Sequence, residues 1–129
     1  MINTFILIML LIAVALGGTI PRAMASEQEE RAVAALEQDL KTDSNNAELW
    51  LHLGFAYRKL GKIDQAQNAF EKAVALNPRE TNAFYMLGLI YESKHMTSQA
   101  QQAWKNYLAA ETNSDQRAIA QKHIHHLNQ

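Results

Sequence analysis

The sequence predicts an all-α fold, an α-solenoid of stacked antiparallel helix pairs. Two observations predict it: an internal repeat at an offset of 34 residues, and apolar residues at helical spacing within each repeated stretch. No strand pattern competes, because β-branched residues are sparse and no long run alternates between apolar and polar residues. The repeat holds at seven positions, where Trp50, Leu53, Gly54, Tyr57, Ala66, Phe70 and Ala73 recur as Phe84, Leu87, Gly88, Tyr91, Ala100, Trp104 and Tyr107.

The first full repeat covers residues 47–80 and contains two predicted helices, 47–59 and 63–76. The first helix has Gly54 near its middle, where Gly costs about 1 kcal/mol relative to Ala. A Gly at such a position indicates that a second helix passes too close for a side chain. The second helix offers small residues for close approach, and we expect Phe70 to fill the remaining gap. The turn signals are Gly61 after the first helix and Asn77-Pro78 after the second.

The second full repeat covers residues 81–114, with helices predicted at 81–94 and 97–110. Two repeats bury too little apolar surface alone, so the flanks are expected to complete the stack. Upstream, Ala32, Leu36 and Leu40 form an apolar stripe in a helix at 27–42, and we interpret 26–46 as half of a degenerate repeat. Downstream, 115–129 predicts a capping helix, in which these side chains can face the stack: Ile119 or Ala120, Ile124 and Leu127.

The stretch from Trp50 to Pro78 resembles the tetratricopeptide repeat. That family's pattern is Trp-x2-Leu-Gly-x2-Tyr, then a small residue, an aromatic, another small residue and a Pro. The second repeat departs from it, with Thr112 in place of the Pro and Tyr107 where a small residue is usual. The resemblance implies stacked helix pairs that bind other proteins, as an adaptor or scaffold. All eight signature positions are filled in the first repeat, by Trp50, Leu53, Gly54, Tyr57, Ala66, Phe70, Ala73 and Pro78.

The N-terminal segment has the pattern of an export signal. Residues 5–16 are apolar and uncharged, Gly17-Gly18 and Pro21 follow, and Ala23-Met24-Ala25 matches a signal-peptidase site. No Lys or Arg precedes the apolar run, so a basic start is missing. We expect residues 1–25 to be a signal peptide cleaved after Ala25. The alternative is an uncleaved membrane anchor, for which 2–20 is barely long enough. Both place the repeats outside the inner membrane of a bacterium, as a periplasmic or anchored domain.

The composition excludes several classes of protein. The chain has 12 basic and 13 acidic residues, a formal charge of −1. Residues 1–25 contain one Arg and no acid, so the remainder carries −2. No basic stripe predicts nucleic-acid binding. The chain has no Cys, which excludes disulfides, a lipid anchor on Cys and covalent haem attachment through Cys-x-x-Cys-His. We expect no cofactor.

The family resemblance also implies where a partner binds. In tetratricopeptide arrays the first helix of each pair lines a concave groove, along which peptide ligands lie. Chaperone-binding members hold a C-terminal carboxylate with Lys and Asn, but this chain has Leu51 and Phe55 there, so we set that activity aside. The alternative is that Leu51, Phe55, Tyr85 and Leu89 touch neighbouring helices or a second copy of the chain. The residues expected to contact a protein or peptide client are Leu51, His52, Phe55, Lys59, Tyr85, Met86 and Leu89.

Catalytic and metal-binding patterns are weak. The sequence has no Gly-rich phosphate loop, no His-Glu-x-x-His and no Gly-x-Ser-x-Gly, so it does not predict an enzyme. His123 and His126 are three residues apart and would share a helix face, but a metal site needs at least a third protein ligand. We expect the His-rich end to be a polar helix terminus, where cations are favourable.

Two classes of function stay open. The first is a binding module that captures an extended client outside the inner membrane. A narrower form of it rests on the acidic helix that leads through Leu40 and Asn45-Asn46 into a Trp-led repeat. This arrangement resembles the periplasmic repeat domains of cytochrome c maturation factors, which hold apocytochrome. The second class is a structural subunit that docks into an envelope complex or self-associates.

Overall fold

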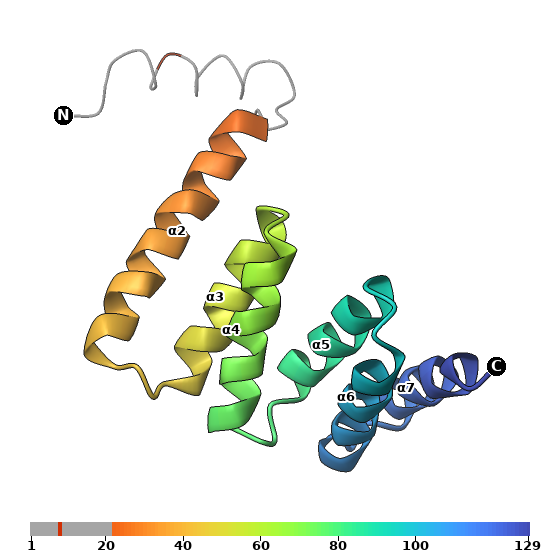
Figure 1. The fold of residues 1–129 in the computed structure, drawn as a ribbon. Coiled ribbons are helices and arrows are strands. Elements are labelled where there is room, and N and C mark those ends of the chain that lie inside the picture. The colour runs from red at the N-terminus through yellow and green to blue at the C-terminus, as the bar shows by residue number, and fades with distance from the viewer. Residues whose placement is uncertain (1–7, 9–21) are drawn as a thin grey trace.

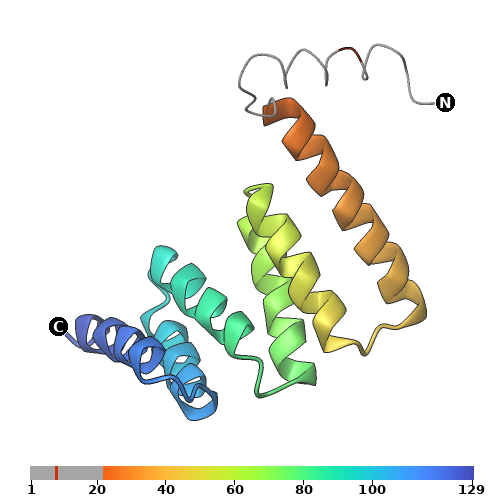
Figure 2. The same cartoon turned by 180° about the vertical axis from the view of Figure 1, so that it is seen from behind.

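A computed structural model of the chain describes residue 8 and residues 22–129. Over residues 22–129 the backbone forms six helices that follow one another in a row (Figure 1). From behind, the same row runs from α2 at one end to α7 at the other (Figure 2). The expected helical repeat fold is confirmed. The helices are α2 (Arg22–Thr42), α3 (Ala47–Lys59), α4 (Ile63–Leu76), α5 (Thr81–Ser93), α6 (Thr97–Ala110) and α7 (Ser114–Leu127).

The helix ends follow local chemistry. The Asn46 side chain accepts hydrogen bonds from the backbone N–H groups of Glu48 and Leu49 and so caps α3. Asn113 caps α7 in the same way. Gly61, after α3, has φ of 72°, a left-handed conformation that glycine adopts without strain. His95 occupies the equivalent position after α5 with φ of 56°, so the turn geometry repeats although the glycine does not.

The bounds of α3, α4 and α6 are those expected from the sequence, whereas the flanking helices differ. Helix α2 begins at Arg22, before the expected start at residue 27, so the segment around Ala25 is helical. Helix α7 begins at Ser114 and α5 ends at Ser93, each one residue from the expected position. The expected signal or anchor segment, 1–25, lies mostly outside the described residues, and its cleavage stays a prediction.

The core is a chain of three apolar clusters that run along the row. One joins α2, α3 and α4, the second joins α3 to α6, and the third joins α5, α6 and α7. Trp50 and Tyr57 contact both the first and the second cluster, while Tyr85 and Leu89 contact both the second and the third. Each helix therefore packs chiefly against its neighbours in sequence, as stacked repeats do.

The two mid-helix glycines lie where helices meet most closely. A Cβ atom at Gly54 would lie 2.6 Å from the Phe70 ring, and one at Gly88 would lie 2.5 Å from the Trp104 ring. Phe70 and Trp104 are both fully buried. The aromatic residue of the second helix thus fills the space that the glycine leaves on the first helix, in both repeats.

The flanking helices cover the two ends of the stack with few side chains. On α2 the buried apolar residues are Val33 and Leu40, whereas Ala32 is exposed. The expected stripe is wrong at this position, because the face of α2 that meets α3 is rotated by one residue. On α7 the buried residue is Ala120, and Ile119 is 37% exposed, which decides between the two alternatives. Ile124 and Leu127 also pack on the stack, as expected.

Candidate functional site

The predicted client-binding residues lie on α3 and α5, at three different depths. Two of them, His52 and Lys59, are exposed. Phe55, Tyr85 and Leu89 are half-buried. Leu51 and Met86 are only 8% and 7% exposed. The helical spacing brings the α3 members onto one face but does not decide how deep each one lies. We call the α3 and α5 surface around His52, Phe55 and Leu89 the groove face.

Leu51 and Met86 form the floor of this face rather than its surface. Both belong to the cluster that joins α3 to α6, so neither offers a client more than a small area. Phe55 lies above this floor, with its ring edge against Phe70 at 5.2 Å between centroids. The inter-repeat angle brings α5 over Leu51, an effect that helical spacing within α3 does not reveal.

Tyr85 points along the stack instead of into the groove face. Its ring lies 5.4 Å from that of Trp104 and 5.8 Å from that of Tyr107, measured between centroids. Edge-to-face pairs at this distance add packing energy beyond simple burial. Its place in the C-terminal aromatic cluster makes Tyr85 chiefly a packing residue between α5 and α6. The client contacts predicted at this position and at Leu51 and Met86 are therefore small, and client binding itself stays a prediction.

Two hollows adjoin the groove face, and His52 lines both. The first, about 590 Å³, lies between the start of α3 and the segment that leads into α5. The second, about 420 Å³, lies between α2 and α3. Residues lining the first are Asp43, Asn45, Asn46, Ala47, Glu48, Leu51, His52, Asn77, Glu80 and Asn82. Residues lining the second are Glu29, Ala32, Ala35, Leu36, Asp39, His52, Phe55, Ala56 and Lys59.

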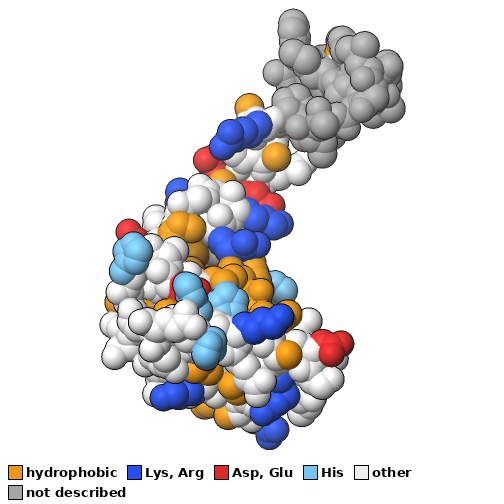
Figure 3. Space-filling model, turned by 90° about the vertical axis from the view of Figure 1, so that its right-hand side faces the viewer, with side chains coloured by type: hydrophobic (Ala, Val, Ile, Leu, Met, Phe, Trp, Pro, Cys, Tyr) orange, Lys and Arg blue, Asp and Glu red, His pale blue; other side chains and the backbone are white. Residues whose placement is uncertain are grey.

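The second hollow extends the site onto α2, which sequence reasoning missed. The available signal was Ala32 with Ala35 and Leu36, small and apolar residues at helical spacing on a helix expected to flank the repeats. In the space-filling view, hydrophobic side chains gather where the α2 arm joins the other helices, with Lys, Arg and His side chains nearby (Figure 3). A client on the groove face could therefore also contact α2.

The two hollows differ in charge. Three carboxylates line the first, those of Asp43, Glu48 and Glu80, and no Lys or Arg of the described residues lines it. The His52 ring lies near one of these carboxylates, with Nε2 at 3.6 Å from Glu48 Oε1. The second hollow has both signs, and Lys59 Nζ lies 2.8 Å from Glu29 Oε1 across it. The groove face therefore has only carboxylates at one end, and at the other end it has Lys59 together with the carboxylates of Glu29 and Asp39.

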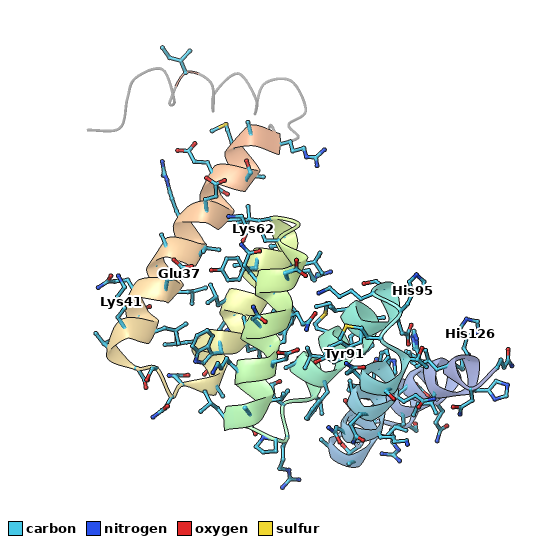
Figure 4. The ribbon with its side chains drawn as sticks, in the orientation of Figure 1. Glu37, Lys41, Lys62, Tyr91, His95 and His126 are labelled. Atoms are coloured by element: carbon cyan, nitrogen blue, oxygen red, sulfur yellow. The ribbon has the colours of Figure 1, made fainter. Side chains whose placement is uncertain are left out.

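Tyrosine–carboxylate hydrogen bonds join successive repeats. The Tyr57 hydroxyl donates to Glu37 on α2, and the Tyr91 hydroxyl donates to Glu71 at 2.7 Å. Both pairs span 20 residues and are related by the repeat offset. Glu37 and Tyr91 are labelled in Figure 4. This repetition places α2 in the register of a second helix of a preceding repeat, which the sequence signalled through the spacing of Glu37 and Glu71.

Burial, followed by the hydrogen bond to Glu37 and the negative charge of Glu37, raises the pKa of Tyr57 to about 12. Burial also raises the pKa of Tyr91, with Glu71 contributing the same two effects. Both phenols therefore stay protonated and donate their hydrogen bonds throughout the neutral range.

The junction with α7 uses a different contact. The repeat offset would place Lys105 and His125 where the earlier junctions have Glu and Tyr, so that link is lost. Instead Glu92 accepts from the Trp104 indole N–H at 2.6 Å and lies 2.9 Å from His123 Nδ1. The His123 ring also stacks on Trp104 at 4.3 Å between centroids. This contact fixes the rotation of α7, which its sequence pattern left open.

The C-terminal histidines do not come together. His123 faces Glu92, whereas His126 is exposed and points away from the helices (Figure 4). In the part of the chain that the structure describes, no three His, Cys, Asp or Glu side chains are grouped as metal ligands. Across residue 8 and residues 22–129, no helix combines the length and apolar character needed to span a bilayer.

Comparisons with known proteins agree with this geometry. Two sequence models described as "Tetratricopeptide repeat" match residues 47–80 and 69–102. A curated relative is the formate-dependent nitrite reductase complex bifunctional subunit NrfFG of Haemophilus influenzae, 33% identical over 89 residues, which are 67% of this chain and 23% of that protein. The chain spans less than a quarter of the length of the first curated relatives that it matches.

Solved structures share the fold. The TPR domain of Arabidopsis OM64 superposes with a TM-score of 0.68 at 21% identity, over 81% of this chain and 86% of that one. The first TPR of Spaghetti (RPAP3), described as bound to the HSP90 peptide SRMEEVD, gives 0.67 at 21% identity, over 82% and 87%. The chain therefore contains tetratricopeptide repeats, a fold that typically serves as a non-catalytic module for protein–protein interaction.

Proposed function

We propose that this protein is a non-catalytic adaptor that binds a segment of a client protein on the groove face. The observation that carries this proposal is the pair of hollows on either side of His52, next to the half-buried ring of Phe55. A groove that is polar at one end and more apolar at the other suits an extended or amphipathic peptide. The fold relative RPAP3 supports the mode of binding, because its structure contains a bound peptide.

We further propose that the adaptor acts outside the inner membrane of a bacterium. The support is the apolar run 5–16 followed by Ala23-Met24-Ala25. A fusion of residues 1–35 to alkaline phosphatase, which is active only after export, tests this localisation. N-terminal sequencing of the mature chain then separates a cleaved product, which begins at Ser26, from an anchored one in the membrane fraction. A phosphatase fusion that stays inactive would refute the proposed localisation and would not affect the proposal that the groove face binds a client.

Site-specific photocrosslinking tests the groove. A photoreactive amino acid is introduced at His52, on the groove face, and in a second variant at Lys72, an exposed position of α4 away from both hollows. Crosslinked partners are isolated from cells and identified by mass spectrometry. We expect a client peptide to crosslink from position 52 and not from position 72. Equal crosslinking from both positions, or crosslinking only to another copy of the chain, would refute the groove.

A second candidate function is that of a structural subunit docked into an envelope redox complex, whereas holding apocytochrome during cytochrome c maturation would be a form of the adaptor. The name of the Haemophilus influenzae relative favours the docked subunit, since that protein is a subunit of a nitrite reductase complex. A docked subunit would bury its outer helices against the complex. The same experiment separates the two functions, because such a subunit gives a constant partner crosslinked from Lys72.

A further inference from the structure

We propose that the client segment is cationic: a Lys or Arg side chain enters the first hollow, and apolar side chains of the same segment lie on Phe55. This inference deepens the proposed function and rests on it. The source of the charge is a side chain of an extended segment, because the hollow at the start of α3 adjoins a second hollow farther along α3, and His52 lines both.

The first hollow is lined by three carboxylates that have no Lys or Arg partner among the described residues. Asp43 accepts a hydrogen bond from the Asn46 amide, and Glu80 accepts one from the backbone N–H of Asn82. Neither bond neutralises a carboxylate. Glu48 contacts only His52, at 3.6 Å, and its side chain is 80% exposed. Three like charges around one hollow attract a cation and repel an acidic peptide, and such repulsion contributes to specificity.

Lys59, the one Lys or Arg among the described residues that lines the second hollow, is already paired within the chain. Lys59 Nζ lies 2.8 Å from Glu29 Oε1. Lys94, at the end of α5, lies 2.5 Å from Asp64 Oδ1 and 2.6 Å from Gln67 Oε1. Their charges are therefore partly neutralised within the chain, whereas the carboxylates of the first hollow have no Lys or Arg partner among the described residues. The charge available to a client is consequently negative.

The two hollows can be spanned by one segment. His52 lines both, so a chain leaving the first hollow passes His52 and reaches the surface of Phe55 and Leu36. Leu51 lies at the floor of the first hollow, where the aliphatic stem of a Lys or Arg side chain can pack while its charged group reaches the carboxylates. The order of chemistry along the groove is thus acidic, then apolar.

Peptide binding measured by fluorescence anisotropy tests the inference. The probes are a labelled, amidated peptide of alternating Lys and Leu, the same peptide with Glu in place of each Lys, and the acidic peptide SRMEEVD that accompanies RPAP3. We expect the Lys peptide to bind at least tenfold more tightly than either acidic peptide, with affinity falling as salt is raised. Equal binding of the Glu peptide would overturn the inference.

Neutralising the hollow gives the matched comparison. The variant Glu48→Gln/Glu80→Gln keeps the side-chain shape and the oxygen that caps α5 while removing two charges. We expect it to weaken binding of the Lys peptide about tenfold. The control Glu30→Gln/Asp115→Asn removes two exposed charges away from the hollow and should change binding less than twofold. Equal weakening in both variants would show that net charge, not the hollow, attracts the peptide.

The crosslinking from position 52 separates this inference from the proposed function. A client segment that crosslinks there and contains Lys or Arg beside apolar residues supports both. A segment that crosslinks there but is acidic or uncharged overturns the inference and leaves the adaptor intact. The absence of any client at position 52 overturns both.

Discussion

Substitution of the mid-helix glycine tests the packing that defines each repeat. Gly54→Ala would ordinarily stabilise a helix interior by about 1 kcal/mol. Here the new Cβ would lie 2.6 Å from two atoms of the Phe70 ring and 2.9 Å from a third. Phe70 is fully buried and has no free space into which to move. We therefore expect Gly54→Ala to lower stability, against the helix propensity.

The magnitude follows from two opposing terms. Overpacking a well-packed core costs about 1–3 kcal/mol. Because the new Cβ would lie 2.6 Å from a fully buried ring, we expect the cost of Gly54→Ala to be at the upper end of this range. Subtracting about 1 kcal/mol of helix propensity leaves a net loss of about 2 kcal/mol. For a domain of this size that loss corresponds to a fall in Tm of roughly 8–16 °C. Gly88→Ala, against Trp104, should behave in the same way.

Urea denaturation followed by far-UV circular dichroism measures the effect, and a second background identifies its cause. Phe70→Leu removes ring atoms that the new Cβ would meet, so Gly54→Ala should become neutral or stabilising relative to Phe70→Leu alone. A Gly54→Ala protein as stable as its parent would refute the reasoning. If Gly54→Ala lowers stability equally in the parent and in the Phe70→Leu background, the loss does not come from the contact with the Phe70 ring.

Three further predictions concern the turns and the junctions. His95→Gly should raise stability by up to about 1 kcal/mol, because His95 has φ of 56° and a left-handed non-glycine residue is strained; an unchanged urea midpoint would contradict this. Glu92→Ala should cost about 1–3 kcal/mol by leaving the Trp104 indole N–H and His123 without their acceptor. Glu92→Gln, which keeps an acceptor for the indole, should recover most of that loss in the same assay. Tyr57 has an ordinary pKa of 10.0 that the fold raises to about 12. The stabilisation that comes from this raised pKa of Tyr57 is therefore fully present below pH 10, and it is lost as pH rises toward about 12. The urea midpoint of Tyr57→Phe should accordingly fall less steeply than that of the parent over this range.

Much of the fold could be predicted from the sequence, because the information is local and repeated. Gly61 and the Asn77-Pro78 pair mark helix ends that the structure confirms. The expectation of close approach at Gly54 and of Phe70 filling the gap is also confirmed. These features depend on helical spacing and turn chemistry, which act within about 30 residues of chain. Because the glycine and aromatic pair recurs at a constant offset, the structure tests the expectation of close helix packing twice, at Gly54 and at Gly88.

The candidate site could be predicted only in outline. The resemblance to tetratricopeptide repeats, carried over in the repeat register, implies that α3 and α5 are the helices of the groove face. It does not reveal that Leu51 and Met86 lie in the floor, that Tyr85 packs on Trp104, or that α2 contributes a second hollow. Each of these depends on the angle between successive repeats, which no single helix determines.

The sequence by itself determined the helix positions within the two full repeats, the repeat register and the close contact at each mid-helix glycine, since each follows from periodicity and side-chain size. Only the tertiary structure decided which residues of a helix face stay accessible and where the carboxylates of Asp43, Glu48 and Glu80 gather. The physical reason is that burial and electrostatic potential are sums over neighbours from several helices. The rotation of α7 was decided in the same way, by the contacts of His123 with Glu92 and Trp104.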